Sequence, residues 1–268
     1  MGYLHSEGEN VMRKAKREKK IKKVKMIGIT ILAVLFLISA TYLVLHFYNS
    51  NKNKKLYEDL DLDIDVVMEE ITKVDSKFVA KVKELQQENS DVVGWIRIEN
   101  TNINYPLLQG TDNDYYLTHN YKKEYSSYGS IYLKTQSDIK DVNSNVHIYG
   151  HSFKDKQMFG TLKEYKSKEF YKEHPIIYIA TEEDEAEYQI IYVFKSRIFY
   201  KDETNVFRYY QCYNFNNEEE YNYYIENCKA VQLYDTGITA KYGEQLITLS
   251  TCDSSQDDTR IVVVAKKI

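Results

Sequence analysis

The feature that most limits how this chain can fold is an apolar stretch near its N-terminus. Residues 26–48 span 23 positions without an Asp, Glu, Lys or Arg. About 20 apolar residues are enough for a helix to cross a bilayer, whereas the apolar core of a signal peptide is shorter. We therefore expect an uncleaved transmembrane signal anchor over residues 26–48. Cleavage is the alternative, because Ser39, Ala40 and Thr41 offer small residues.

Charge is distributed unevenly on the two sides of this stretch. Residues 1–25 hold nine Lys or Arg and three Glu, a net charge of +6, which leaves −10 for the rest of a chain whose total is −4. Because basic flanks stay on the cytoplasmic side, we predict a basic cytoplasmic tail over 1–25. The chain would then be a single-pass cell-membrane protein with its main domain outside. The acidic main domain argues against nucleic-acid binding.

Residues 49–88 are predicted to lead from the membrane to the main domain. A short polar linker over 49–56 is followed by apolar residues at three- and four-residue steps, which indicate one or two amphipathic helices packed on that domain. An undocked spacer coil is the alternative, which the apolar stripe disfavours. The stripe consists of Leu60, Ile64, Val67, Ile71, Val74, Phe78, Val82 and Leu85.

From residue 89 the pattern changes to short strands and turns, in a chain with 26 Tyr and only 2 Pro. Helices are expected only at 159–165 and at 218–228, the second capped by Asn216 together with Glu219. Eight or nine short strands with few helices predict a mainly β fold closed into a barrel over residues 89–268. The predicted strands are 92–98, 103–108, 130–133, 146–149, 176–180, 188–200, 230–233, 246–251 and 261–265.

The last two predicted strands carry a thiol and a guanidinium. Cys252 ends one strand and Arg260 starts the next, so a rigid sheet would aim both side chains at one point. The plainer interpretation is a half-buried Cys and a surface Arg. A nucleophilic thiol needs a base or a cationic neighbour. Of six histidines, His5 lies in the tail and His46 in the apolar stretch, so neither can serve an external site.

His151 is the favoured base among the remaining histidines. Strand alternation places His147 and Tyr149 on one face, and we expect Gly150 to break the strand so that His151 opens a loop. We expect His147 to be a packed strand residue. In this scheme Cys252 attacks a carbonyl and forms a thioester, His151 transfers protons, and Arg260 binds the substrate backbone or the developing oxyanion.

The other candidate groups leave open questions. Cys212 and Cys228 could pair and leave Cys252 free, or they could stay unpaired. The acidic residues of the loop 253–259 could orient His151, bind a cation or simply be solvated. No His, Cys, Asp or Glu cluster has metal-ligand spacing, so we expect no metal and no cofactor.

Several motifs in the right order resemble the sortases, and class B sortases in particular. The segment Thr248-Leu-Ser-Thr-Cys252 with Arg260 resembles their Cys–Arg signature, and Ile148-Tyr149-Gly150-His151 resembles their catalytic-His motif. The resemblance covers roughly residues 85–268. It extends through Asp91-Val-Val-Gly-Trp95-Ile, Ile103-Asn-Tyr105-Pro106-Leu, Gln109-Gly-Thr-Asp-Asn113-Asp-Tyr-Tyr116-Leu117 and Gly129-Ser-Ile-Tyr132-Leu.

The resemblance implies an eight-stranded barrel and a cysteine transpeptidase of Gram-positive cell-wall anchoring. Such an enzyme cleaves a C-terminal sorting signal after Thr, the signal being Asn-Pro-Gln-Thr-Asn-like or Ser/Asn-Pro-x-Thr-Gly-like. It then joins the surface protein to an amine of peptidoglycan or lipid II. The family's catalytic residues correspond to Cys252, His151 and Arg260. Its substrate-groove residues correspond to Asn113, Leu117, Tyr149 and Ser250.

The chain departs from the family pattern at two positions near these motifs. Ser152 follows His151 where Asn or His is more usual, and Lys134 stands where an acidic residue commonly occurs. We expect both to affect substrate choice. Two other functions remain open, a membrane-anchored cysteine peptidase that only hydrolyses and a non-catalytic surface-binding module.

Overall fold

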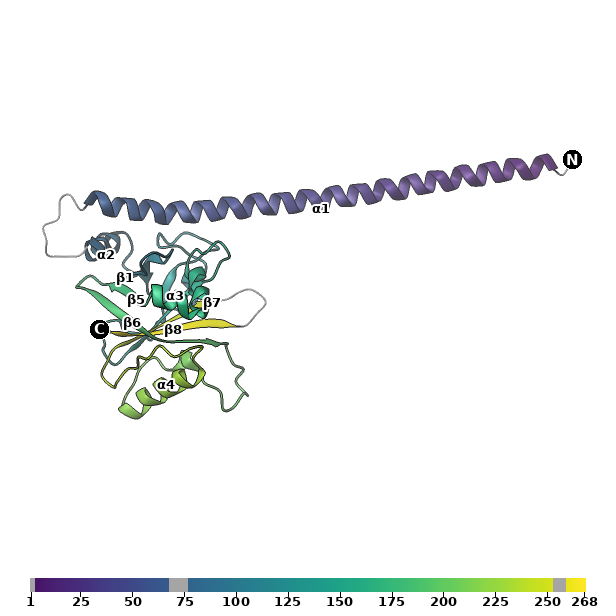
Figure 1. Ribbon diagram of the computed structural model, residues 1–268. Coiled ribbons are helices and arrows are strands. Elements are labelled where there is room, and N and C mark those ends of the chain that lie inside the picture. Colours follow the sequence, from purple (N-terminus) through teal and green to yellow (C-terminus); the bar gives the residue numbers. More distant parts are fainter. Residues whose placement is uncertain (1–2, 68–76, 253–258) are drawn as a thin grey trace. The chain divides into compact units, whose positions relative to one another are not determined.

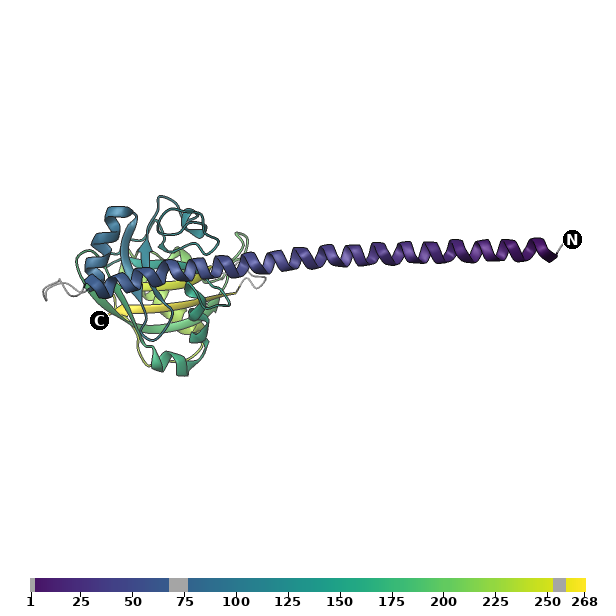
Figure 2. The same ribbon diagram turned by 90° about the horizontal axis from the view of Figure 1, so that it is seen from above.

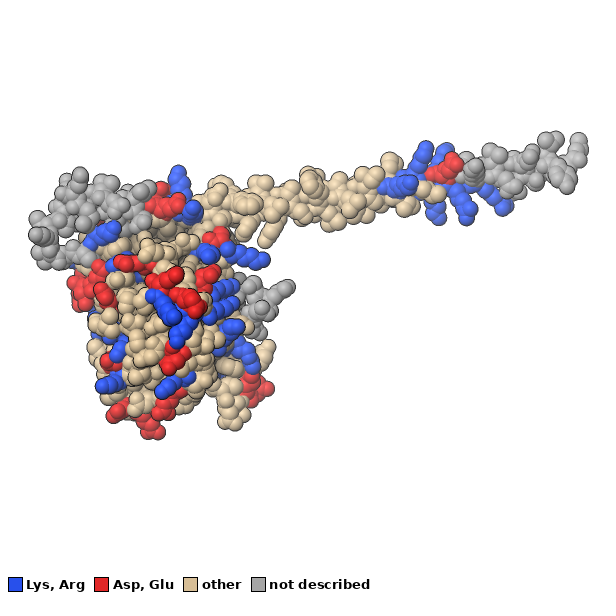
Figure 3. Space-filling model, viewed as in Figure 1, with Lys and Arg blue, Asp and Glu red and all other residues tan. Residues whose placement is uncertain are grey.

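The N-terminal part of the chain is one long helix. The computed structural model describes residues 3–67, 77–252 and 259–268, except the side chains of 3–12, 14–15, 61–67 and 252. Helix α1 (Tyr3–Val67) contains a stretch of mean hydropathy 2.5 that is long and apolar enough to cross a membrane. The large apolar side chains of residues 26–48 are exposed, and Figure 3 shows this part of the helix in tan beside a blue basic segment. Residues 49–56, predicted as a linker, continue the helix because neither Gly nor Pro interrupts them.

The chain divides into two compact units, Met1–Lys52 and Asn53–Ile268. In the second unit Tyr57 and Leu60, from the last turns of α1, are buried in the hydrophobic core. Helix α2 (Lys77–Glu88) buries Phe78, Val82 and Leu85 in the same core, so this part of the predicted apolar stripe is confirmed. The stripe residues Ile71 and Val74, and the side chains of Ile64 and Val67, lie outside the described residues.

Eight strands close into a barrel, as the sequence predicted (Figures 1 and 2). Around the barrel the order is β1-β2-β3-β4-β7-β8-β6-β5, with β2·β3 and β4·β7 parallel and the other neighbours antiparallel. The strands are β1 (Val92–Arg97), β2 (Asn104–Leu108), β3 (Ile131–Leu133), β4 (Asn145–His151), β5 (Ile176–Ala180), β6 (Glu185–Ser196), β7 (Leu246–Cys252) and β8 (Arg260–Lys267).

The remaining helices of the barrel unit lie in the connections between its strands. The segment predicted as helix 159–165 is a 3-10 helix, and Figure 1 shows α4 against one side of the strands. The helical elements of the connections are η1 (Tyr115–Leu117), η2 (Phe159–Lys166), α3 (Lys168–Glu173), η3 (Tyr209–Gln211) and α4 (Glu218–Val231).

Two predictions about this region are wrong. The segment 230–233 is not a barrel strand, because α4 extends to Val231 to bury Cys228 and Ile225, and only an isolated bridge joins Gln232 to Phe194. The helix cap is one residue later than predicted. The side-chain oxygen of Asn217 accepts from the backbone N–H of Glu220 at 2.9 Å, one step on from the predicted pair of Asn216 and Glu219.

Alternation along the strands divides the core into two layers. Ile148, Leu249 and Val263 belong to the larger cluster, which also includes the side chains of α2 and β1. The intervening positions on the opposite face, such as Val262 and Val264, pack in a second cluster with Tyr224 of α4. The long connection between β6 and β7 therefore covers one outer face of the sheet.

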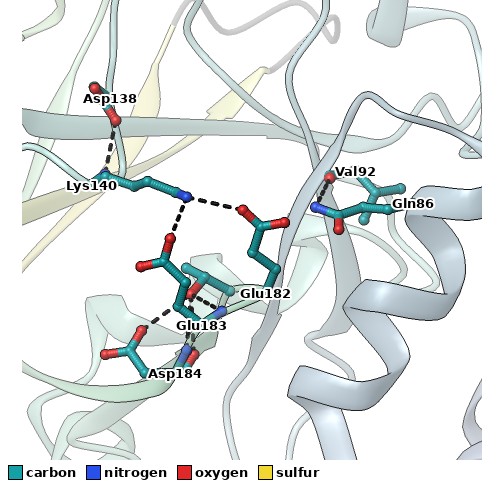
Figure 4. Close-up of polar contacts among 8 residues, drawn as sticks. Gln86, Val92, Asp138, Lys140, Glu182, Glu183 and Asp184 are labelled. Atoms are coloured by element: carbon teal, nitrogen blue, oxygen red, sulfur yellow. Dashed lines mark hydrogen bonds and ion pairs between the residues drawn. The ribbon is translucent and has the colours of Figure 1, made fainter.

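The loop after β3 is tied to the turn between β5 and β6 (Figure 4). The Lys140 ammonium donates to Glu182 at 3.0 Å and to Glu183 at 2.6 Å. All three groups are exposed, so these ion pairs stabilise the fold little. A stronger tie joins the same loop to the residue before β7. Gln245 is buried there and donates to the carbonyl oxygen of Ile139 at 2.8 Å.

Candidate active site

Backbone pairing brings the three predicted catalytic positions to one end of the barrel. His151 at the end of β4 is the register partner of Cys252 at the end of parallel strand β7. Arg260 begins β8, which runs antiparallel to β7. Cys252 therefore lies on the middle one of three adjacent strands, flanked by the strands of the histidine and the arginine. The Cys252 side chain and the acidic residues Asp253, Asp257 and Asp258 lie outside the described residues.

The His151 ring is oriented by a backbone carbonyl. Its Nε2 atom lies 2.8 Å from the carbonyl oxygen of Leu117, in η1. A carbonyl oxygen can only accept, so Nε2 carries a proton and Nδ1 is the ring nitrogen that does not contact this carbonyl. Phe153 contacts the ring edge-on, with 5.7 Å between ring centroids. This half-buried ring is thus held in one tautomer and one orientation.

Gly150 has a different role from the one predicted. Strand β4 does not break there but continues to His151. A Cβ atom on Gly150 would lie 2.4 Å from Cδ1 of Ile131 and 3.0 Å from the ring of Phe159. Glycine is needed because these side chains fill the barrel beneath it. The tight packing holds the end of the strand that carries His151.

Arg260 is anchored to the chain next to Cys252. Its Nη1 donates to the carbonyl oxygen of Thr251 at 2.7 Å, and the Thr251 hydroxyl accepts from the backbone N–H of Ile261 at 3.3 Å. The Nε atom of Arg260 is buried without a hydrogen-bond partner among the described residues. The guanidinium thus keeps donor capacity close to the backbone of Cys252, where an oxyanion or a substrate carbonyl could accept it.

A cavity of about 420 Å³ adjoins His151 and Arg260. Three predicted groove residues, Asn113, Leu117 and Tyr149, are on its wall. Asn113 also accepts from the backbone N–H of Thr135 at 2.9 Å, which fastens the η1 loop to the segment after β3. The full lining consists of Asn113, Asp114, Leu117, Tyr132, Lys134, Tyr149, His151, Ile198, Tyr210 and Arg260.

Ser250, the fourth predicted groove residue, does not reach the cavity. It is fully buried, and its hydroxyl lies 2.8 Å from the hydroxyl of Tyr209 in η3. Alternation does put Ser250 on the Cys252 face of β7, but the connection between β6 and β7 covers it. Tyr210, from the same connection, lines the cavity instead. No sequence pattern identified it, because it belongs to an irregular segment.

His147 and the other two cysteines are poor candidates for the chemistry. Burial, with a smaller contribution from the Lys134 charge, lowers the pKa of His147 to about 3. Burial raises the pKa of Cys212 to about 11, and it raises that of the fully buried Cys228 as well. Both thiols are free. His147 is therefore a neutral packed residue, as predicted, and neither of these thiols readily forms a thiolate.

Within the described ranges, no group of three or more His, Cys, Asp or Glu side chains could hold a metal ion. A thiol, an imidazole held in one tautomer and a guanidinium are suited to acyl transfer.

Residues 96–268 match the sortase domain. The chain belongs to the sortase family. Sortase B of Listeria monocytogenes is 32% identical over 233 residues, which cover 87% of this chain and 91% of the relative. Sortase B of Staphylococcus aureus is 30% identical over 243 residues, 90% of this chain and 95% of the relative.

Solved structures agree with this assignment. The Staphylococcus aureus sortase B–substrate complex superposes with a TM-score of 0.71 at 28% identity, covering 82% of this chain and 97% of that one. The sortase is thus of class B, with the closed barrel of that class. Sortases of this class are cysteine transpeptidases, and this chain is one of them.

Proposed function

We propose that this sortase cleaves a C-terminal sorting signal after Thr and joins the protein to a cell-wall amine, with Cys252 as the nucleophile. The observation that carries the proposal is the position of Cys252 on β7, between the strands of His151 and Arg260, two residues that line one cavity. The chain's other two thiols have raised pKa values, which supports Cys252 further.

In the first half-reaction Nδ1 of His151 takes the proton of the Cys252 thiol, and the resulting thiolate attacks the Thr carbonyl carbon. A C–S bond forms, the peptide C–N bond breaks, and the leaving amine takes a proton from Nδ1 of His151. Arg260 donates hydrogen bonds to the oxygen on which negative charge develops. The carbonyl oxygen of Leu117 keeps a proton on Nε2, so Nδ1 is the atom that accepts and donates protons during the reaction.

In the second half-reaction an amine of peptidoglycan or lipid II attacks the thioester. Nδ1 of His151 now accepts the proton of the incoming amine, and the Cys252 thiolate leaves as the new amide forms. The solved substrate complex of the Staphylococcus aureus enzyme supports the peptide substrate by similarity. We propose that the peptide lies against Asn113, Leu117 and Tyr149, and that its signal is Asn-Pro-Gln-Thr-Asn-like or Ser/Asn-Pro-x-Thr-Gly-like.

A cleavage assay with matched cysteine variants tests the proposal. The full chain in detergent micelles is incubated with fluorogenic sorting-signal peptides of both types, with and without triglycine as the amine acceptor. We expect Cys252→Ala to abolish cleavage and Cys212→Ala to retain it. Cleavage by the Cys252 variant at the wild-type rate would refute the proposal. An amide product indicates transfer, and free acid alone would indicate a hydrolase.

We also propose the membrane arrangement of the chain. Residues 1–25 form a cytoplasmic tail, 26–48 the anchor, 49–88 the helical connection and 89–268 the catalytic barrel outside the cell membrane. The apolar segment of α1 and its basic flank support this topology. Protease added to intact cells should remove the barrel and leave an N-terminal fragment. Full protection of the barrel until the cells are lysed would contradict the topology.

A further inference from the structure

Lys134 is a cation on the cavity wall that the proposed mechanism does not use. It follows β3 directly, and its backbone N–H donates to the carbonyl oxygen of His147 at 2.9 Å. Tyr132, two residues earlier, lines the same cavity, so the two side chains leave the strand on one face. Lys134 therefore shares its cavity with His151 and Arg260.

The ammonium of Lys134 is held in place by neutral groups. Nζ donates to the carbonyl oxygen of Tyr210 at 2.5 Å and lies 4.1 Å from the ring centroid of Tyr213. The side chain is half-buried, and burial lowers its pKa below the ordinary value for lysine. An ammonium has three donors, and the carbonyl oxygen takes only one of them. The arrangement fixes the position of the charge without neutralising it.

No carboxylate of the described residues pairs with this ammonium or with the guanidinium of Arg260. Asp114 is the one acidic residue on the described wall, and it is exposed and forms an ion pair with neither cation. Among the described residues, two partly buried cations thus face a small cavity with one peripheral carboxylate on its wall. Burying unpaired charge is unfavourable, so an occupant with a carboxylate would be bound better than a neutral one.

The position of Lys134 sets how far this carboxylate is from the reacting bond. Lys134 lies opposite His147, four residues along β4 from His151. At about 3.3 Å per residue this is roughly 13 Å along the strand. Because an extended peptide has the same rise, the carboxylate would lie three or four residues from the bond that is cut or formed.

We propose that Lys134 is a specificity residue that binds a carboxylate of the substrate, an inference that rests on the proposed transpeptidase function. The carboxylate is either an acidic side chain of the sorting peptide, three or four residues from the scissile bond, or the terminal carboxylate of a short peptide acceptor. Both sources place the same anion against the same ammonium, and separate assays distinguish them.

The test compares substrates that differ only in charge. Donor peptides carry Glu, Gln or Lys three or four residues before or after the scissile bond, and cleavage is measured with water as the acceptor. Acceptors are tetraglycine and tetraglycine amide, compared with a neutral donor. The enzymes are the full-length wild type in detergent micelles, Lys134→Met, Lys134→Glu and Lys140→Met. Lys140 serves as the matched control because it lies in the same loop, exposed and away from the cavity.

We expect the wild type to favour the acidic member of one set by about tenfold in kcat/KM, as for a charged hydrogen bond. A Glu preference in hydrolysis identifies the sorting peptide as the source, and a preference for tetraglycine over its amide identifies the acceptor. Lys134→Met should lose the preference and Lys140→Met should keep it. If the carboxylate belongs to the sorting peptide, the Lys134→Glu enzyme should cleave the peptide that carries Lys faster than the one that carries Glu. The ratio between substrates of one enzyme is insensitive to the fraction of a variant that folds.

Two results would overturn the inference. The first is a wild type that is active without any charge preference in either assay. The second is a Lys134→Met variant that keeps the wild-type preference. Both leave the transpeptidase function standing. A wild type inactive on every peptide would instead refute the proposed function and, with it, this inference.

Discussion

Stability should depend on pH through His147, a residue buried two positions before Tyr149 on the same strand. Its ring stacks on Tyr209 with 6.1 Å between centroids, and its Nε2 lies 3.1 Å from the carbonyl oxygen of Cys212. Burial and then the charge of Lys134 lower its pKa to about 3. In the unfolded chain a histidine titrates near 6.5.

The sign of the effect follows from these two values. Because the folded pKa is the lower one, the unfolded state binds a proton between about pH 3 and pH 6.5 that the folded state does not bind. The stabilising contribution of neutral His147 is complete above about pH 6.5 and is lost as the pH falls. From pH 7 to pH 5 this one group should lower the free energy of unfolding by about 2 kcal/mol.

Urea unfolding of the full chain in detergent micelles measures this. Trp95 is the only tryptophan of the sequence and is buried in the core, so its fluorescence reports unfolding of the barrel. His147→Gln should be less stable than the wild type at pH 7. Between pH 7 and pH 5, however, its free energy of unfolding should decrease by about 2 kcal/mol less than that of the wild type. Equal pH dependence in the two proteins would refute the argument that this ring is buried and neutral.

Four further substitutions test local contacts by the same urea titration. Gly150→Ala should lower the free energy of unfolding by about 1–3 kcal/mol, because the new methyl group meets Ile131, and an unchanged midpoint would contradict this close approach. Asn217→Ala should cost about 1 kcal/mol and Asn216→Ala less, since Asn217 caps α4; the reverse order would favour the cap expected from the sequence. Tyr209→Phe should cost about 1–2 kcal/mol by leaving a buried serine hydroxyl without its partner, and no loss would contradict that hydrogen bond.

Strand periodicity predicted the barrel because each strand alternates between two apolar layers. Both layers require apolar residues, so the segment 261–265 is almost continuously apolar and easily recognised as a strand. The segment 230–233 also contains apolar residues, Ala230, Val231 and Leu233, yet packing of Cys228 extends the preceding helix through Val231. Tertiary contacts override local propensity in this segment, and the sequence pattern contains no sign of them.

The site was predictable where it depends on strand ends and not where it depends on irregular chain. Cys252 and Arg260 flank one short loop, and the register of β4 with β7 adds His151. Ser250 was assigned to the groove from the resemblance to sortases, and the structure shows it covered. Its cover comes from Tyr209, 41 residues earlier in the chain, in a connection with no regular pattern. The catalytic roles of the three residues remain predictions.

The central claim is that an acyl group is carried on Cys252, and trapping that intermediate tests it most directly. The full chain is mixed with a sorting-signal peptide and quenched in acid within the first turnovers, and the modified residue is located by peptide mapping and mass spectrometry. The account predicts an adduct of the mass of the N-terminal cleavage product on Cys252. The adduct should be lost on addition of an amine acceptor, with an amide product of equal amount. An adduct on Cys212 or Cys228, or amide formation by Cys252→Ala, would contradict it.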